Sequence, residues 1–398
     1  MDNLISIVGS TCKHVEGNNS LIIFRALKTL TISVLPNLES WHEEDFESVD
    51  FPELKTLRIV NCPKLKYVPT HMPLITFLSV SGCSEIKLRQ ISYLPLLSKL
   101  SIELENMSLR EPDAFKPPKT LEELTIEGYE NVYPLEEEEK QLISCQTRPA
   151  IRELNIRTSH CFLSCGPGPS KAVALKFWKY FTAVENLEIW SCDGLVFWPE
   201  EELRSLECLK RLHIDSCRNF TGALIAQQQV SSLGDSSSQT LPQSLHHLEV
   251  LKISQCPELV QIPVVCSKSL KDLFIRCPKL DIEEMMTHLI TNPTGLKKLI
   301  IIGSTHWRVW PDNMENLPSL VDLLIGNCPG MESFPPGLQQ RLPSLQYLVI
   351  IDCPALERRC RSGGDYYHLV SPIPRKDIGR YEPKGKSFLK KLPCIRGS

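Results

Sequence analysis

The chain has 398 residues, 42% of them hydrophobic, with a formal net charge of −3 and a sequence pI near 6.4. A balance this close to neutral excludes a general attraction to nucleic acid or to an anionic membrane. The N-terminal residues MDNLISIVG lack a basic segment, and no apolar run reaches the roughly 18 residues of a membrane helix. We therefore expect a soluble, cytoplasmic protein with no membrane span and no nucleic-acid partner.

A frame of apolar residues returns along the sequence, and the stretch LKTLRIVNCPKL at Leu54 shows it clearly. An apolar residue stands first, others follow three, five and eleven residues later, and Cys usually follows eight later. From the first start to the last, 318 residues hold twelve intervals, a mean period of about 26. Thirteen copies begin at Leu27, Leu54, Ile75, Leu97, Leu121, Ile151, Val184, Leu209, Leu248, Leu270, Leu296, Leu320 and Leu345.

This period predicts an α/β solenoid of about 13 leucine-rich repeats. Apolar residues at the fourth and sixth positions alternate with residues facing the other way, as in a strand. One short strand buries its apolar side only against the next repeat, so the strands form a parallel sheet on the concave side of a horseshoe. Prolines on the return path, as at 65–69 and 307–311, predict loops and short helical turns on the convex side.

The repeats divide the chain into three parts. Residues 1–26 form a partial N-terminal repeat and loop, residues 27–374 form the leucine-rich-repeat domain, and residues 375–398 form a basic tail that we expect to be disordered. Insertions at 131–150, 161–183 and 221–247 interrupt the repeat. Binding of a partner by one of these loops stays an alternative to their being solvated loops.

The 16 cysteines admit a structural or a metal-binding interpretation. Half of them recur near the turn after the strand, one repeat apart, without the paired Cys-x-x-Cys spacing of a zinc site. Leucine-rich repeats often carry Asn at this turn, and a small buried thiol fills the same place. The close pair Cys161 and Cys165, beside His160, is the one alternative metal site, and we expect no metal to bind.

The pattern L-x-x-L-x-I-x-x-C-P-x-L, seen at Leu54, Leu248, Leu320 and Leu345, resembles the C-terminal repeat domain of plant nucleotide-binding leucine-rich-repeat disease-resistance proteins. The ending CPALERRCRSGGDYYHLVSPIP, residues 353–374, is similar to the close of the coiled-coil class of that family, except that Ser371 and Pro372 separate His368 from the final Ile-Pro. The resemblance implies an autoinhibitory, protein-recognition region of a cytoplasmic plant immune receptor. Its implied partners are a pathogen effector, a guarded host protein and the nucleotide-binding domain of the receptor itself.

No phosphate loop of the form G-x-x-x-x-G-K-[ST] occurs, so we expect this chain to bind no ATP and to need no cofactor. The sequence also lacks G-x-S-x-G, H-E-x-x-H and a recognisable Cys/His nucleophile, so we predict no enzyme activity. A second hypothesis is a substrate adaptor of a ubiquitin ligase, whose repeats also contain Cys. Such adaptors usually carry a ligase-binding helical segment before the repeats, which is not seen here.

The candidate partner-binding residues point away from the core on the concave side. A second-position column alternates in sign, and the outward residues near the C-terminus become apolar. The predicted contacts are Arg152, Glu185, Trp190, Lys210, Phe274, Ile300, Ile302, Leu324, Val349 and Ile351. Charge reversal of Arg152 or Lys210, or aspartate at both Ile300 and Leu324, is expected to weaken binding with the fold intact.

Two alternatives stay open at this point. The alternating charges can simply neutralise one another between neighbouring strands. The apolar patch, instead of meeting a partner, can lie beneath the C-terminal segment through Tyr366, Tyr367 and Leu369.

Overall fold

The computed structural model describes the parts of the chain on which the fold rests. These are residues 4–8, 20–22, 25–42, 48–69, 71–86, 89–103, 118–128, 151–158, 178, 181–224, 245–262, 269–291, 295–311, 314 and 317–379. Most of the three predicted insertions lies outside these residues, as do His160, Cys161, Cys165 and the tail from residue 380 onward. The chain divides into two compact units, residues 1–270 and 271–398.

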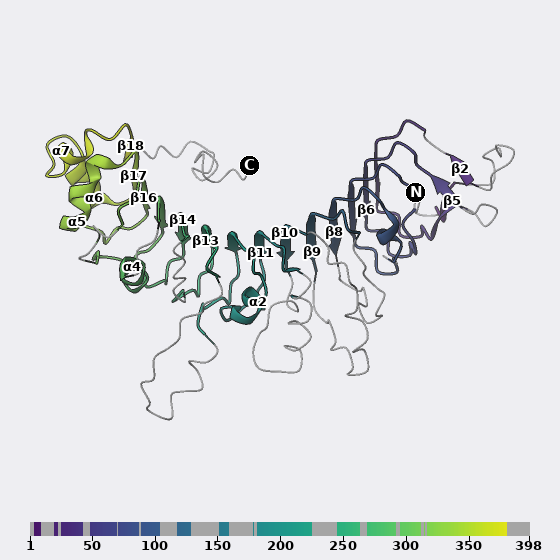
Figure 1. Ribbon diagram of the computed structural model, residues 1–398, viewed down its shortest axis with the longest axis horizontal. Helices are drawn as coiled ribbons and strands as arrows, with labels where there is room; N and C mark the ends of the chain where they lie inside the picture. Colours follow the sequence, from purple (N-terminus) through teal and green to yellow (C-terminus); the bar gives the residue numbers. More distant parts are fainter. Residues whose placement is uncertain are drawn as a thin grey trace, which may run out of the picture. The chain divides into compact units, whose positions relative to one another are not determined.

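Each of the thirteen predicted repeats contains a five-residue strand that begins two residues after the predicted start. Together with one later strand they form a 14-stranded parallel sheet whose strand order follows the chain. The predicted leucine-rich-repeat solenoid is therefore confirmed. In Figure 1 each strand of the first unit lies beside its predecessor. The strands of this unit are β3 (Thr29–Ser33), β6 (Thr56–Val60), β7 (Phe77–Ser81), β8 (Lys99–Glu103), β9 (Glu123–Glu127), β10 (Glu153–Arg157), β11 (Asn186–Trp190), β12 (Arg211–Asp215) and β13 (Val250–Ser254).

The second unit continues the same pattern and ends one strand later than the sequence suggests. Its strands are β14 (Asp272–Arg276), β15 (Lys298–Ile302), β16 (Asp322–Gly326), β17 (Tyr347–Ile351) and β18 (Arg375–Ile378). The strand β18 pairs in parallel with β17 and lies beyond residue 374, where the repeat pattern ends in the sequence. Because β18 lacks the apolar frame of the repeats, its sequence carries no sign of a strand.

Among the described residues, four short strands lie outside the main sheet, in the N-terminal part of the first unit. The strand β1 (Ser6–Val8) pairs in parallel with β4 (Ser40–His42), and β2 (Ser20–Ile22) pairs in parallel with β5 (Ser48–Asp50). They form two separate two-stranded sheets. Residues 1–26 thus supply two strands that the repeat frame does not mark.

The core lies along one face of the sheet, where the apolar frame of the repeats is buried. In the repeat that begins at Leu54, the side chains of Leu54, Leu57 and Ile59 are fully buried. Register places equivalent residues side by side, so Leu154 lies between Leu124 and Leu187. Burying one such side chain contributes about 2 kcal/mol, and each repeat obtains this contribution only from its neighbours.

The chain leaves almost every strand through a residue with positive φ, which the sequence does not reveal. In the described part of the chain eight such residues are not glycine, and Gly82 and Gly303 occupy the same position in two other repeats. A left-handed backbone is costly for a residue with a Cβ, especially a β-branched one, so the fold imposes it. The eight residues, with φ between 48° and 57°, are Val34, Asn61, Thr158, Ser191, Ser216, Gln255, Asn327 and Asp352.

The recurring cysteines close these turns with a hydrogen bond to the end of the strand. Seven thiols each donate to the carbonyl oxygen two residues earlier, over S–O distances of 3.2 to 3.6 Å. The residues are Cys62, Cys83, Cys192, Cys217, Cys256, Cys328 and Cys353, all buried and free. The structural interpretation of these cysteines is confirmed, with a short, specific bond added to the expected packing.

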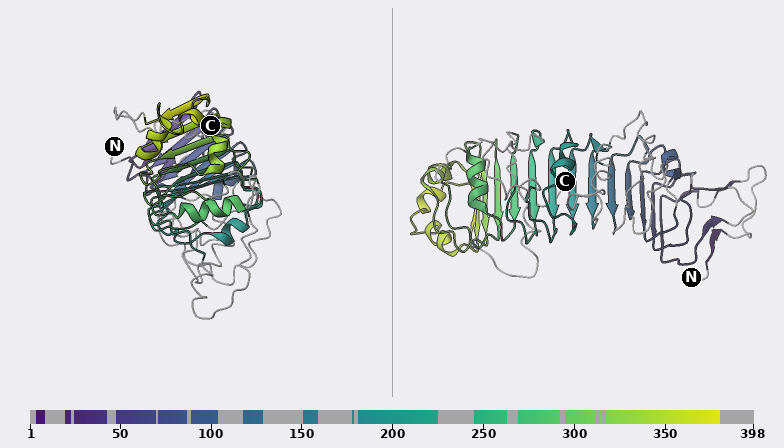
Figure 2. Two further views of the ribbon diagram at one scale, coloured as in Figure 1. Left: turned by 90° about the vertical axis from the view of Figure 1, so that its left-hand side faces the viewer. Right: turned by 90° about the horizontal axis from the view of Figure 1, so that it is seen from below.

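The return path is made of loops and short helices, as predicted. The longest described helix has 10 residues, and Figure 2 shows the strands of each unit side by side, with short helices among their connections. The helices are η1 (Arg89–Tyr93), α2 (Glu200–Arg204), α4 (Ile282–Thr291), α5 (Pro336–Arg341), η6 (Leu342–Ser344), α6 (Pro354–Cys360) and α7 (Tyr367–Val370).

Aromatic residues pack inside these return segments. Trp198 stacks on Phe220 with ring centroids 6.2 Å apart, and Trp310 lies 6.3 Å from Phe334. Both tryptophans are buried, so they contribute to packing within the return segments. Near the C-terminus, the ring of Tyr366 packs on Phe334, with centroids 5.6 Å apart.

Candidate functional site

The face of the sheet opposite the core carries the candidate binding residues. We call it the open face, and it consists of the residue before each main-sheet strand together with the first, third and fifth residues of that strand. One strand contributes a row of four such side chains, and equivalent positions on successive strands form columns. Because each strand pairs in register with the next, neighbours in a column lie about 4.8 Å apart.

In the first unit the open face is polar and charged. The predicted column runs Glu122, Arg152, Glu185, Lys210, Glu249, and Arg152 and Lys210 are exposed. The Lys210 Nζ lies 2.8 Å from Glu185 Oε2, and this bond holds the pKa of Glu185 below its usual value. Part of the column therefore does neutralise itself, as the alternative interpretation expects.

A second ion pair joins the first residues of strands β8 and β9. Lys99 Nζ and Glu123 Oε2 are 2.5 Å apart, and the carboxylate raises the pKa of Lys99. Both members of each pair remain partly accessible, so each pair contributes well under about 1 kcal/mol to stability. Their main effect is to fix the positions of charges on the open face.

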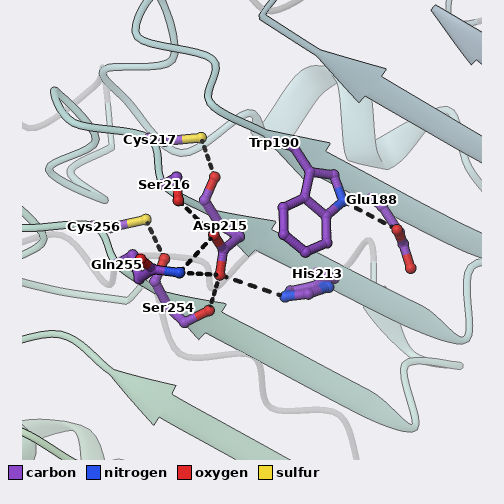
Figure 3. Close-up of polar contacts among 9 residues, drawn as sticks. All are labelled: Glu188, Trp190, His213, Asp215, Ser216, Cys217, Ser254, Gln255 and Cys256. Carbon is purple, nitrogen blue, oxygen red and sulfur yellow. Dashed lines mark hydrogen bonds and ion pairs between the residues drawn. The ribbon is translucent and has the colours of Figure 1, made fainter. Parts of the chain in front are cut away.

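Trp190, at the end of β11, belongs to the cluster of side chains that Figure 3 shows. Its indole Nε1 donates to Glu188 Oε2 over 3.0 Å, which holds the ring against the strand. Its ring meets the imidazole of His213 in a T-shaped arrangement, with centroids 4.7 Å apart. An ordered aromatic ring that is half-buried on an otherwise polar face is well suited to anchor a partner.

Asp215 ends β12 and is buried on this face, where it collects hydrogen bonds from the next turns. Ser216 Oγ donates to Asp215 Oδ1 over 2.6 Å, Ser254 Oγ donates to Oδ2, and Gln255 Nε2 lies 3.1 Å from Oδ1. Ser216 and Gln255 are two of the residues with positive φ, so the turn geometry directs their side chains back over the carboxylate. The Asp215 side chain is thus fixed in place.

His213 lies between these groups. Its Nε2 is 3.9 Å from Asp215 Oδ2, which is too long for a hydrogen bond. Burial lowers the pKa of His213 below its usual value, although the charges of Glu188 and Asp215 act in the opposite direction. The imidazole is therefore neutral at pH 7, and it offers one donor and one acceptor on the open face.

The sequence identified Trp190 but missed the rest of this cluster. The sequence pattern singles out none of His213, Asp215 and Ser254. Their signal is positional, because all of them occupy open-face positions in three consecutive repeats. Only the observed register and side-chain directions show that they meet.

Part of the open face of the second unit is apolar and buried, unlike the exposed patch that the sequence suggests. Other positions on this face stay charged, such as Lys298 and Asp322, which form an ion pair. Ile300, Leu324, Val349 and Ile351 are each at most 4% exposed and form one cluster. Phe274, Ile302 and Tyr347 pack against it and are half-buried. We call these seven residues the apolar cluster. Large outward side chains on adjacent strands bury one another, so these residues contribute to stability.

The aromatic residues of the C-terminal segment make other contacts. The hydroxyl of Tyr366 lies 3.4 Å from Gln339 Nε2 and accepts a hydrogen bond from Arg359 over 3.2 Å, and Tyr367 is 46% exposed. These contacts belong to α5, α6 and the helical turn α7 and not to the apolar cluster.

Within the described residues, no group of three or more His, Cys, Asp or Glu side chains is placed to hold a metal ion. Likewise, no helix in the described part of the chain has the length and apolarity to cross a bilayer. The open face of the first unit presents ion pairs, hydrogen-bonding groups and the ring of Trp190.

No protein-family model matches the chain, and no curated protein matches its sequence. Among solved structures, the chain is similar to TLR13 in its complex with ssRNA13, at 12% identity and a TM-score of 0.45, over 84% of this chain and 49% of that one. It is also similar to the internalin inlF from Listeria monocytogenes str. 4b F2365, at 13% identity and a TM-score of 0.38, over 92% and 88%. The chain spans about half the length of the TLR13 chain.

With both TM-scores below 0.5, the assignment rests on the strands and repeats of the chain itself. Those features define a leucine-rich-repeat solenoid with a charged open face in the first unit.

Proposed function

We propose that this chain is the protein-recognition and autoinhibitory leucine-rich-repeat region of a cytoplasmic plant immune receptor. Two observations support the proposal. The Cys-Pro repeat and the ending at residues 353–374 resemble those of plant disease-resistance proteins. The open face of the first unit presents exposed charges around an ordered tryptophan, which suits a protein partner.

The single observation that carries the binding role is the Trp190 cluster. Trp190 is held by Glu188 and His213, and it lies on the same face as Arg152, Glu185 and Lys210. These residues are accessible in whole or in part, whereas Ile300, Leu324, Val349 and Ile351 of the apolar cluster are at most 4% exposed. We therefore assign partner contact to the first unit, and the partner is a pathogen effector, a guarded host protein or the nucleotide-binding domain of the receptor.

Co-precipitation with a coiled-coil and nucleotide-binding fragment of a plant receptor of this class tests the proposal. The wild-type chain should bind the fragment, and Trp190→Ala with Lys210→Glu should reduce binding about tenfold or more with unchanged circular dichroism. The exposed reversal Lys119→Glu, outside the strands, is the matched control and should bind as wild type. Absence of binding by the wild-type chain, or equal binding by all three proteins, contradicts the proposal.

A further inference from the structure

The rows of the open face alternate in charge across four consecutive strands of the first unit. The row of β9 carries three glutamates, and the row of β11 carries two. The rows of β10 and β12 each carry two bases and one acid, which leaves +1 when His213 is neutral. The rows are Glu122, Glu123, Thr125 and Glu127 on β9; Arg152, Glu153, Asn155 and Arg157 on β10; Glu185, Asn186, Glu188 and Trp190 on β11; and Lys210, Arg211, His213 and Asp215 on β12.

Many of these charges are not used inside the sheet. The pairs Lys99–Glu123 and Lys210–Glu185 occupy one end of the rows. Arg152, Arg157 and Arg211 are exposed and form no ion pair with another residue that the structure describes. The alternation thus leaves accessible charge of both signs on the open face.

The spacing of the rows matches one kind of secondary structure. Adjacent rows lie about 4.8 Å apart, so rows of like charge repeat every 9.6 Å or so. An α-helix advances about 5.4 Å per turn, and seven residues span about 10.5 Å. A helix that crosses the strands therefore brings residues i and i+7 over the two acidic rows, and residues i+3 or i+4 over the basic row between them. Same-side residues of an extended chain recur about every 6.6 Å and fall out of step.

Trp190 adds an anchor in the acidic row of β11. A basic side chain from the partner can lay its aliphatic stem and cation on the indole ring while Glu188 neutralises its charge. An acidic partner residue one turn later meets Arg211 and the neutral imidazole of His213 on β12. Both contacts follow from the same helix placement.

We propose that the open face of β9 to β12 binds an α-helix of a partner protein that crosses the strands, with basic residues at i and i+7 and acidic residues at i+3 or i+4 and at i+10 or i+11. The proposal rests on the proposed function, in that it assumes the open face binds protein. It deepens that function by stating the chemistry of the partner.

Two hydrocarbon-stapled helical peptides of about 18 residues test the charge pattern. One carries the alternating bases and acids, and the other has the same composition with the bases and the acids grouped at opposite ends. Fluorescence anisotropy with the 398-residue chain should show the alternating peptide binding about tenfold more tightly at low salt, with the difference shrinking as salt rises. Equal affinities of the two peptides overturn the proposal.

A charge reversal in the protein tests the assigned rows. Arg152→Glu with Arg157→Glu turns β9 to β11 into three acidic rows, and it should weaken binding of the alternating peptide about tenfold. The matched control is Lys55→Glu with Arg58→Glu, which makes the same change of net charge in the row of β6 on the same face. The control should bind within about twofold of wild type, so equal loss in both variants overturns the proposal.

These experiments distinguish a failure of the helix proposal from a failure of the proposed function. If the receptor fragment binds the wild-type chain and depends on Trp190, but the alternating peptide has no advantage over its isomer, the helix proposal fails and the proposed function stands. If the receptor fragment does not depend on Trp190, the proposed function fails as well.

Discussion

The two units of this chain share one backbone pattern but differ in the polarity of the open face. In most strands of both units the second and fourth residues are buried aliphatic side chains, and the turn after many of them places a cysteine against the strand end. On the other side of the sheet, the third residues of β11 and β12 are Glu188 and His213, whereas the third residues of β16 and β17 are Leu324 and Val349. The difference shows that the inner frame sets the fold, while the outward residues decide whether a repeat presents polar or apolar side chains on the open face.

The largest expected effect comes from placing a charge on each surface. Leu324→Asp buries an unpaired carboxylate in the apolar cluster, so it should lower the free energy of unfolding by about 4 kcal/mol. The matched control is Ser79→Asp at the same strand position of β7, which should cost less than about 0.5 kcal/mol. Urea unfolding measures both.

This expectation corrects the sequence-based one, in which aspartate at Ile300 and Leu324 leaves the fold intact. The correction follows from their burial, since each is only 3% exposed. A Leu324→Asp variant as stable as Ser79→Asp would show that the open face is no more buried at Leu324 than at Ser79.

A second comparison concerns the turns with positive φ. In the second unit, a Cβ added to Gly303 would meet no atom closer than 4.0 Å, so Gly303→Ala tests backbone strain alone and should cost about 1 kcal/mol. In the first unit, Val34 is β-branched and 65% exposed at φ 56°, so Val34→Gly should stabilise by about 1 kcal/mol. Thermal unfolding measures both shifts, and changes of the same sign would contradict this role for the turns.

The pH dependence of stability should report on His213 in the first unit. Burial lowers its pKa in the folded state, so the unfolded chain binds the proton more readily. Stability is then fully present above the unfolded pKa of about 6.5 and falls as pH drops from there toward the folded pKa, by at most about 1.4 kcal/mol per pH unit. His213→Gln should flatten this slope, measured by urea unfolding between about pH 5 and 8.

The control for this effect is His368→Gln in the second unit, where the side chain is exposed. It should leave the slope unchanged. Equal slopes in wild type and His213→Gln would mean that the buried imidazole does not couple folding to protons.

The smallest effect is expected from the ion pair on the open face. Lys210→Met should change the free energy of unfolding by less than about 0.5 kcal/mol, since Lys210 and Glu185 are both well exposed to solvent. The difference from wild type should vanish in about 1 M salt, where screening acts within roughly 3 Å. A decrease of more than about 2 kcal/mol in the free energy of unfolding would show that the ion pair mainly stabilises the fold.

Most of the fold could be predicted from the sequence because the apolar frame is periodic. All thirteen strand starts follow from residues such as Leu54, Leu57 and Ile59, whose spacing alone determines the buried side. The left-handed turns could not be predicted, since Val34 and Thr158 are among the residues least suited to them and the neighbouring repeats impose the conformation. The strand β18 was missed because it pairs without carrying the frame.

The sequence predicts the candidate site only for residues whose position in the repeat places them on the open face. Arg152, Glu185 and Lys210 were placed correctly on the open face by counting positions, and Trp190 with them. The contacts of Asp215 with Ser254 and Gln255 join residues about one repeat apart through side-chain directions, which no spacing reveals. For the apolar cluster, spacing gave the face but not the mutual burial of large neighbouring side chains.

Hydroxyl-radical footprinting of the 398-residue chain, free and bound to the receptor fragment, most directly tests the contrast between the open face of the first unit and that of the second. The account predicts that Trp190 and His213 are oxidised in the free chain and protected in the complex, while Leu324 and Val349 are unreactive in both. Oxidation of Leu324 and Val349 in the free chain, followed by their protection on binding, would contradict it.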